Sequence, residues 1–277
     1  MNFKTITAAV AIAGAGLAIV ACQPTAYQPN PYGNDVWSGY KTATLETRAM
    51  QDDDFANPGM PWVDGAAELY DTPAGETKLS CADCHGAPDD ETGGKVGVPM
   101  KGVGARYPVF DEATQKPINV ELRINRCRTE KQKAKEFKYE SDAMLGMTGL
   151  IVMQSRGMPR VTTADNPKDA LHPAFKKGEE FYYQRRGQLD MACKHCHEDN
   201  ANNIVRAELL SQGQTNGFPT YRLKWQKPGS LHRRFRGCNK NIRAQPYGYG
   251  SEEYLNLETY LAWRGRGLPV EGPSVRK

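Results

Sequence analysis

Two short segments of this sequence place a pair of thiols and an imidazole in the same order. Cys81 to His85 and Cys193 to His197 both have the pattern Cys-x-x-Cys-His. In this pattern the two thiols can add across the vinyl groups of a haem, and the adjacent histidine can be an axial ligand of the iron. The pattern therefore predicts two covalently bound haem c groups, attached through Cys81, Cys84, Cys193 and Cys196, with His85 and His197 as axial iron ligands.

Other chemistries of paired cysteines fit less well. Zinc ribbons separate their two pairs by roughly 15–20 residues, and the pairs that begin at Cys81 and Cys193 are much farther apart. A thioredoxin-like redox pair needs no following histidine, whereas both pairs here have one. Two matches in one chain favour covalent haem over both alternatives.

A lone cysteine follows each attachment segment at nearly the same distance: Cys127 follows the first and Cys238 the second. Because equivalent thiols occur in both halves, we predict that Cys127 and Cys238 are the second axial iron ligands. Thiolate donates strongly to ferric iron and should lower the reduction potential relative to methionine. Such ligation indicates specialised chemistry beside plain electron relay.

Several alternatives for the second ligands remain open. A disulfide between Cys127 and Cys238 is one, because structural disulfides are common in exported proteins. Met158, which precedes a proline as in many small cytochromes, competes for the first haem. The weaker candidates are Met60 and Met100 for the first haem, and His172 and His232 in place of Cys238.

The chain around Cys238 is strongly basic between His232 and Arg243. Guanidinium groups favour thiolate over thiol and can hold an anion through charge-assisted hydrogen bonds. We predict Arg234 as the anion-binding residue, with Arg243 second. The stretch around Cys127 is also basic, with Arg123, Arg126, Arg128 and Lys131, so charge alone does not distinguish the two sites. Gly237, where the first copy has an arginine, would give a substrate closer access to Cys238.

These residues recur because the chain contains an internal repeat. Residues 141–159 and 251–269 align without gaps, and residues 65–70 parallel residues 178–183. Each copy has a helix, a haem attachment segment, a long loop, a lone cysteine and a closing helix. In the second copy, Ser251 is the expected N-cap of the closing helix and Gly265 or Gly267 its end. We predict a mainly α fold of two tandem cytochrome c-like domains with long loops, at residues 46–160 and 161–277.

The N-terminus has the features of an export signal. Lys4 precedes an apolar run from Ile6 to Ala21, which is short for a transmembrane span, so residues 1–21 are the predicted signal peptide. Residues 19–22 also resemble a lipobox, which would make Cys22 the lipidated first residue; the alternative is cleavage near Ala26 with loss of Cys22. Residues 22–45 are the predicted flexible arm. Both routes lead to the periplasm, and the only expected membrane contact is a Cys22 lipid anchor.

The overall charge is only weakly basic, with a formal net charge of +4. The basic residues do not alternate with aromatic residues as on a nucleic-acid-binding surface, so no nucleic-acid partner is expected. A mildly positive face suits an anionic substrate or an acidic protein partner.

Several strings resemble one family closely. They are Thr47 to Asp54, Ser80 to Gly86, Met100 to Val103, Arg236 to Asn239 and Ile242 to Tyr247. Over roughly residues 40–277 the chain resembles the A subunits of the SoxAX cytochromes of bacterial thiosulfate oxidation. The resemblance implies two cytochrome c-like domains and a smaller monohaem X subunit as partner in a heterodimer. It also implies axial ligation by Cys127 and Cys238, a cysteine persulfide at Cys238 and substrate binding by Arg234.

The reaction implied by the resemblance is the oxidative conjugation of thiosulfate to a cysteine thiol of a sulfur-carrier protein. This is an L-cysteine S-thiosulfotransferase activity, in which two electrons leave through the haems to an acceptor cytochrome c. The alternative is a non-catalytic diheme electron-transfer cytochrome c, which methionine or histidine ligands would favour. A diheme peroxidase needs an open or releasable iron position, and two permanent thiolate ligands would not provide one.

Overall fold

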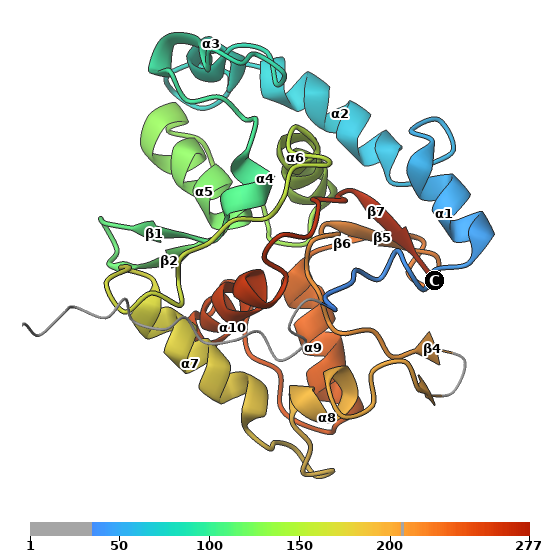
Figure 1. Cartoon of the computed structure of the whole chain (residues 1–277). Coiled ribbons are helices and arrows are strands. Elements are labelled where there is room, and N and C mark those ends of the chain that lie inside the picture. Colours follow the sequence, from blue (N-terminus) through green and yellow to red (C-terminus); the bar gives the residue numbers. More distant parts are fainter. Residues whose placement is uncertain (1–34, 206–207) are drawn as a thin grey trace, which may run out of the picture.

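The structure, a computed structural model, describes residues 35–205 and 208–277. The predicted signal peptide and Cys22 lie outside these residues. The described chain is mainly helical, as predicted, with short strands between the helices (Figure 1). Within these ranges, none of the helices has the length and apolar character needed to cross a membrane.

The first lobe contains the helices from the blue to the yellow-green part of the chain in Figure 1. They are α1 (Leu45–Asp52), α2 (Met60–Asp71), α3 (Ala82–His85), α4 (Val103–Arg106), α5 (Val120–Cys127) and α6 (Asp142–Met153), with a 3-10 turn at Gly94–Val96 and a π turn at Arg128–Gln132. The core of this lobe lies between α2 and α6, where Tyr70, Met144 and Met147 are buried. A hydrogen bond holds the start of the attachment helix α3 against this core: the Cys81 amide donates to the carbonyl of Tyr70 on α2.

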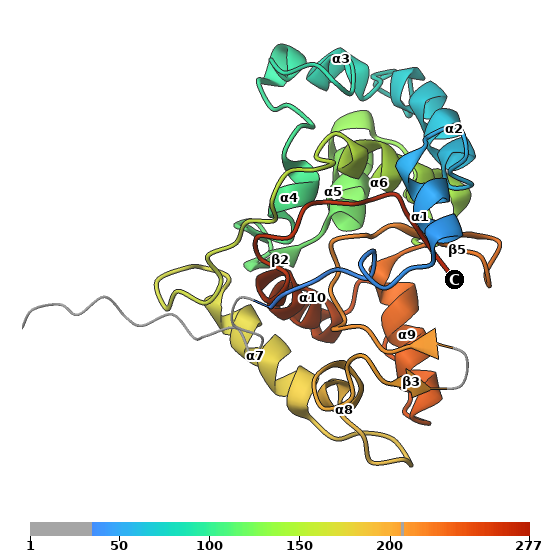
Figure 2. The same ribbon diagram turned by 45° about the vertical axis from the view of Figure 1, so that its right-hand side comes forward.

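The second lobe repeats this arrangement with α7 (His172–Tyr183), α8 (Cys193–His197), α9 (Leu231–Asn241) and α10 (Glu252–Arg264). Helix α7 packs along α10 as α2 packs along α6, and Figures 1 and 2 show the two lobes on opposite sides of a common interface. The core between α7 and α10 is aromatic, with Phe175, Tyr182 and Tyr260 all buried. The N-cap prediction is confirmed, because the Ser251 hydroxyl accepts from the Tyr254 amide.

Each lobe also contains a short antiparallel hairpin that the sequence did not predict. In the first lobe β1 (Val109–Asp111) pairs with β2 (Lys116–Ile118), and in the second β5 (Thr220–Arg222) pairs with β6 (Lys227–Gly229). Strands of three residues are too short for an alternating pattern to be recognised. Each hairpin leads directly into the helix that carries the lone cysteine, α5 or α9.

The structural repeat differs by one residue from the sequence alignment in the helix before each attachment segment. The alignment pairs Gly65 with Gly178, whereas Ala66 and Gly178 are the residues that contact the closing helix. A Cβ on Gly178 would lie 2.0 Å from the carbonyl oxygen of Asn256 on α10. In the first lobe the small residue is on the other helix, because a Cβ on Gly146 of α6 would lie 2.2 Å from the carbonyl oxygen of Trp62 and 3.1 Å from the Cβ of Ala66. Close helix packing therefore decides the structural register.

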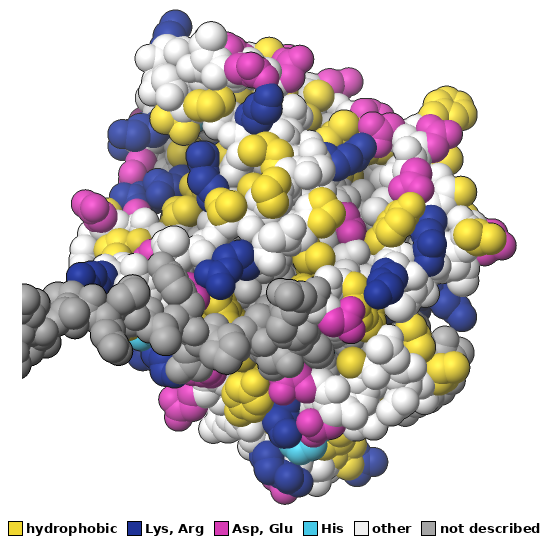
Figure 3. All heavy atoms as spheres, in the orientation of Figure 1, with side chains coloured by type: hydrophobic (Ala, Val, Ile, Leu, Met, Phe, Trp, Pro, Cys, Tyr) yellow, Lys and Arg dark blue, Asp and Glu magenta, His cyan; other side chains and the backbone are white. Residues whose placement is uncertain are grey.

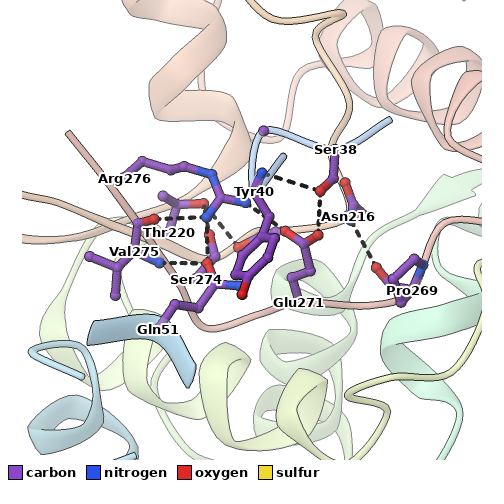
Figure 4. Close-up of polar contacts among 12 residues, drawn as sticks. Ser38, Tyr40, Gln51, Asn216, Thr220, Pro269, Glu271, Ser274, Val275 and Arg276 are labelled. Carbon is purple, nitrogen blue, oxygen red and sulfur yellow. Dashed lines mark hydrogen bonds and ion pairs between the residues drawn. The ribbon is translucent and has the colours of Figure 1, made fainter. Parts of the chain in front are cut away.

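The two ends of the described chain are packed together. Strand β7 (Ser274–Arg276) pairs with β5 in parallel, next to α1. The described end of the predicted flexible arm packs on the second lobe: Trp37 is buried, and its amide donates to Gln212 Oε1 at 2.9 Å. Figure 4 shows how Ser38 and Arg276 both bond to Glu271, which ties the arm to the C-terminal strand.

Candidate functional site

The second attachment segment and the second lone cysteine lie together on one cavity. Cys193, Cys196 and His197 occupy the single turn of α8, and Cys238 lies on α9. All four line a cavity of about 690 Å³, within the range of ligand and cofactor sites. The predicted attachment and ligand residues of this set are therefore brought to one place.

The lining of this cavity suits a haem. Its apolar walls come from α7, α9 and α10 and include Phe181, Leu231, Phe235, Leu257 and Leu261. The His197 Nδ1 atom lies 2.8 Å from the carbonyl oxygen of Ser211. A hydrogen bond at Nδ1 fixes the ring and leaves Nε2 for a metal. The donor set and the walls fit a covalently attached haem c, with the thiols of α8 as attachment points.

Cys238 has a different electrostatic environment from the attachment cysteines. Burial by itself raises its pKa, but Arg234, a hydrogen bond with His197 and the charge of Arg222 outweigh burial and lower the pKa to about 7. In contrast, burial raises the pKa of Cys193 to about 12. The site therefore stabilises a thiolate at Cys238.

Arg234 lies one turn before Cys238 on α9 and lines the same cavity. This position allows one guanidinium to act on both the sulfur and an anion in the cavity. Arg243, the second candidate, lies beyond the end of α9 with a left-handed backbone and is not among the residues that line the cavity. The space beside Gly237 is open, because a Cβ there would have no neighbouring heavy atom within 4 Å.

The first set of residues is also brought together. Cys84 and His85 lie on α3, directly after Cys81, and Cys127 ends α5 near enough for its charge to affect the pKa of Cys81. The His85 Nδ1 atom lies 2.9 Å from the carbonyl oxygen of Val98. This matches the position of His197 Nδ1 beside the carbonyl oxygen of Ser211. The two attachment histidines are therefore oriented in the same way.

The electrostatic environments of the two lone cysteines, Cys127 and Cys238, differ in a way that the sequence did not predict. Burial raises the pKa of Cys127 despite the nearby arginines. Arg126 pairs with Asp111 and Glu130, and Arg123 lies 3.7 Å from Asp111. These carboxylates reduce the positive field that the basic stretch would otherwise produce at Cys127.

The structure also bears on the alternative ligands. Cys127 and Cys238 belong to different sites, and all six cysteines of the described chain are free thiols, so no disulfide joins them. His172 bonds to the carbonyl of Ala164 and His232 to Glu258, and neither is among the residues that line the cavity of Cys238. Three methionines pack in or against the first core: Met60, Met100 and Met158.

Arg222 is a residue of the cavity that sequence reasoning missed. It ends strand β5, lines the cavity and acts on the pKa of Cys238. Its Nε donates to the carbonyl of Lys277 at 2.9 Å. Only the long-range pairing of β5 with β7 places Arg222 here, so no local pattern could have indicated it.

Comparison with known proteins gives consistent similarities. The family profile described as SoxA/TsdA, cytochrome c domain, matches residues 65–160 and 177–270. The SoxA subunit of L-cysteine S-thiosulfotransferase from Rhodovulum sulfidophilum is 43% identical over 258 residues, covering 93% of this chain and 86% of that protein. The same subunit from Pseudaminobacter salicylatoxidans is 43% identical over 240 residues, covering 87% and 80%. The crystal structure of SoxXA from P. pantotrophus superposes with a TM-score of 0.80 at 41% identity, covering 87% of each chain.

Proposed function

The chain belongs to the SoxA/TsdA cytochrome c family, and we propose that it is the A subunit of a SoxAX cytochrome with L-cysteine S-thiosulfotransferase activity. It joins thiosulfate to a cysteine thiol of a sulfur-carrier protein and passes two electrons to an acceptor cytochrome c. The observation that carries this proposal is the shared cavity of Cys238, Arg234 and the α8 attachment segment. One cavity thus combines a stabilised thiolate, an anion-binding cation and the attachment residues of a redox group.

The family is built of cytochrome c domains, which bind haem c. We propose that both attachment segments of this chain carry one, with His85 and Cys127 as axial ligands of the first iron, and His197 and Cys238 as those of the second. Support comes from the equivalent histidine orientation in the two lobes and from the position of each lone cysteine beside its attachment segment. A haem bound by α8 supplies the route by which electrons leave the cavity.

The residues of the cavity define the sulfur chemistry. Arg234 binds the sulfonate oxygens of thiosulfate through charge-assisted hydrogen bonds, which directs the outer sulfur toward Cys238. In the first step the terminal sulfur of a Cys238 persulfide forms a bond with that outer sulfur, and two electrons are lost. In the second step the carrier thiolate attacks the same sulfur, takes the thiosulfate unit and releases the Cys238 persulfide. Overall, thiosulfate and a thiol form a disulfide-linked sulfonate with loss of one proton and two electrons.

The partners and the location are also proposals. The related SoxXA from P. pantotrophus contains a second protein, SoxX, and we propose that this chain pairs with a monohaem X subunit of the same kind. The predicted signal peptide supports a periplasmic location, with Cys22 as a possible lipid attachment point. On the face shown in Figure 3, basic and acidic side chains are interspersed.

The test is Cys238→Ala in the purified complex with haem content verified by absorbance. We expect thiosulfate conjugation to be abolished, and intact mass to show one extra sulfur on the wild-type chain that the variant lacks. Conjugation near the wild-type rate in a fully haem-loaded variant would contradict the proposal.

A further inference from the structure

A small cavity lies between the two lobes, and its walls come from equivalent positions of the repeat. Its volume is about 40 Å³, which is room for one or two water molecules. The facing pairs are Tyr107 and Phe218, Val120 and Leu231, and Thr148 and Glu258; Glu121 and Arg160 also line it. We refer to it as the interlobe cavity.

The interlobe cavity contains two carboxylates and one cation. Glu121 is 7% exposed and Arg160 is 9% exposed, so both are shielded from solvent. Glu258 accepts hydrogen bonds from His232 Nε2 and Asn119 Nδ2, each at 3.1 Å. The amide of Gly250 donates to His232 Nδ1 at 3.0 Å, so the imidazole proton is on Nε2 and the ring is neutral. Among the described residues that line the interlobe cavity, Arg160 is therefore the one cation beside two carboxylates.

This count predicts that Glu121 holds a proton. A second buried negative charge beside Glu258, without a counter-charge of its own, is strongly unfavourable. Burial, reinforced by Glu258, raises the pKa of Glu121 to about 8. The other ionisable groups facing the pair are Tyr139, Glu140 and Arg233. Tyr139 stays neutral because burial raises its pKa. Arg233 lies 3.5 Å from Glu140, so its charge is paired there and does not serve as a second cation for the cavity.

Unpaired polar atoms support a bound water in this cavity. Thr148 Oγ1, Thr215 Oγ1 and Arg160 Nε are buried without a hydrogen-bond partner within the described ranges, and all three residues line the interlobe cavity. Buried polar atoms are normally satisfied by protein or by ordered water. A water here would satisfy them and connect the carboxylates for proton transfer.

The interlobe cavity is separated from the haem-sized cavity by one layer of side chains. Thr215, Phe218 and Leu231 line both cavities. Helix α9 also connects them, because His232 and Cys238 are separated by a rise of about 9 Å along the helix. Across such a thin, poorly polar layer, a change of one charge in one cavity alters ionisation in the other.

We propose that the interlobe cavity is a proton-binding site at Glu121, beside Glu258, which binds a proton when the haem held by α8 gains an electron and releases it on oxidation. One electron on the iron and one proton on the carboxylate pair leave the net charge of the region unchanged. The proposal depends on haem binding at α8 and does not depend on the thiosulfate reaction.

The test is potentiometric titration of the haem-loaded complex at a series of pH values, with dithionite as reductant. We expect the reduction potential of one haem to fall as the pH rises around pH 8. The slope should approach about 59 mV per pH unit, the value for one proton per electron. Glu121→Gln, which imitates the protonated carboxyl, should remove the slope. The control Glu136→Gln removes an exposed carboxylate of the same lobe and should keep it.

A second measurement covers the case in which Glu121→Gln fails to fold. The redox difference infrared spectrum of the wild-type complex above pH 8, where Glu121 is ionised before reduction, should contain a protonated carboxyl band that appears on reduction, and Glu258→Gln should alter it. Potentials independent of pH in both haem transitions, an unchanged slope in Glu121→Gln, or the absence of a carboxyl band would each overturn the proposal.

Discussion

Replacing Arg234 tests the assignment of the anion-binding residue. Arg234→Gln keeps a polar side chain of similar length but removes the charge that faces the cavity of Cys238. A hydrogen bond to a charged group contributes about 1.5–3 kcal/mol, and about 1.4 kcal/mol corresponds to a tenfold change in affinity. The KM for thiosulfate should therefore rise about tenfold to a hundredfold. Arg234→Lys keeps the charge but loses the bidentate hydrogen-bonding geometry. Its KM should therefore lie between that of the wild type and that of Arg234→Gln.

The assay is steady-state conjugation by the haem-loaded complex at varied thiosulfate concentration. The matched control is Lys240→Gln, which removes one positive charge from the exposed side of the same helix α9 and should leave KM within about twofold, as expected for a screened surface charge. Haem content and reduction potentials are measured in every variant. A wild-type KM in Arg234→Gln, or an equal rise in Lys240→Gln, would refute the direct role of Arg234.

Two further predictions concern stability. Gly178→Ala should destabilise the second lobe by about 3 kcal/mol, because the new Cβ would meet the α10 backbone at 2.0 Å. Gly65→Ala in α2, where a Cβ has nothing within 4 Å, should stabilise the protein by about 0.5–1 kcal/mol through helix propensity. Thermal unfolding of both variants measures the two effects. Similar shifts of the melting temperature in both variants would contradict the packing argument. Glu252 has its pKa lowered to about 2 by hydrogen bonds from two lysines. Its stabilising effect is present above the unfolded pKa of 4.5 and is lost as the pH falls toward 2. Melting temperatures should therefore fall less steeply below pH 4.5 in Glu252→Gln than in the wild type, and parallel curves would exclude this contribution.

The parts of the structure that the sequence predicted are those that local patterns determine. The attachment segments are short covalent motifs, and the cap at Ser251 depends on a side chain and a backbone amide three residues apart. Glu258, Arg222 and Glu121 acquire their roles through contacts between segments far apart in the chain, and periodicity carries no information on such contacts.

The two lobes show how one repeat can give two different sulfur environments. Asp111 and Arg222 occupy the same place, at the end of the first hairpin strand, and each pairs with a lysine of the second strand. In the first lobe this position carries a carboxylate, which lies against Arg123 and Arg126 and offsets their charge near Cys127. In the second lobe the same position carries a guanidinium, which adds to the effect of Arg234 on Cys238. The charge inversion at this strand end therefore contributes to the difference between the two thiols, after the larger effects of Arg234 and of the hydrogen bond with His197. It helps to explain why the basic sequences around both cysteines did not by themselves distinguish the site proposed for catalysis from the site of Cys127.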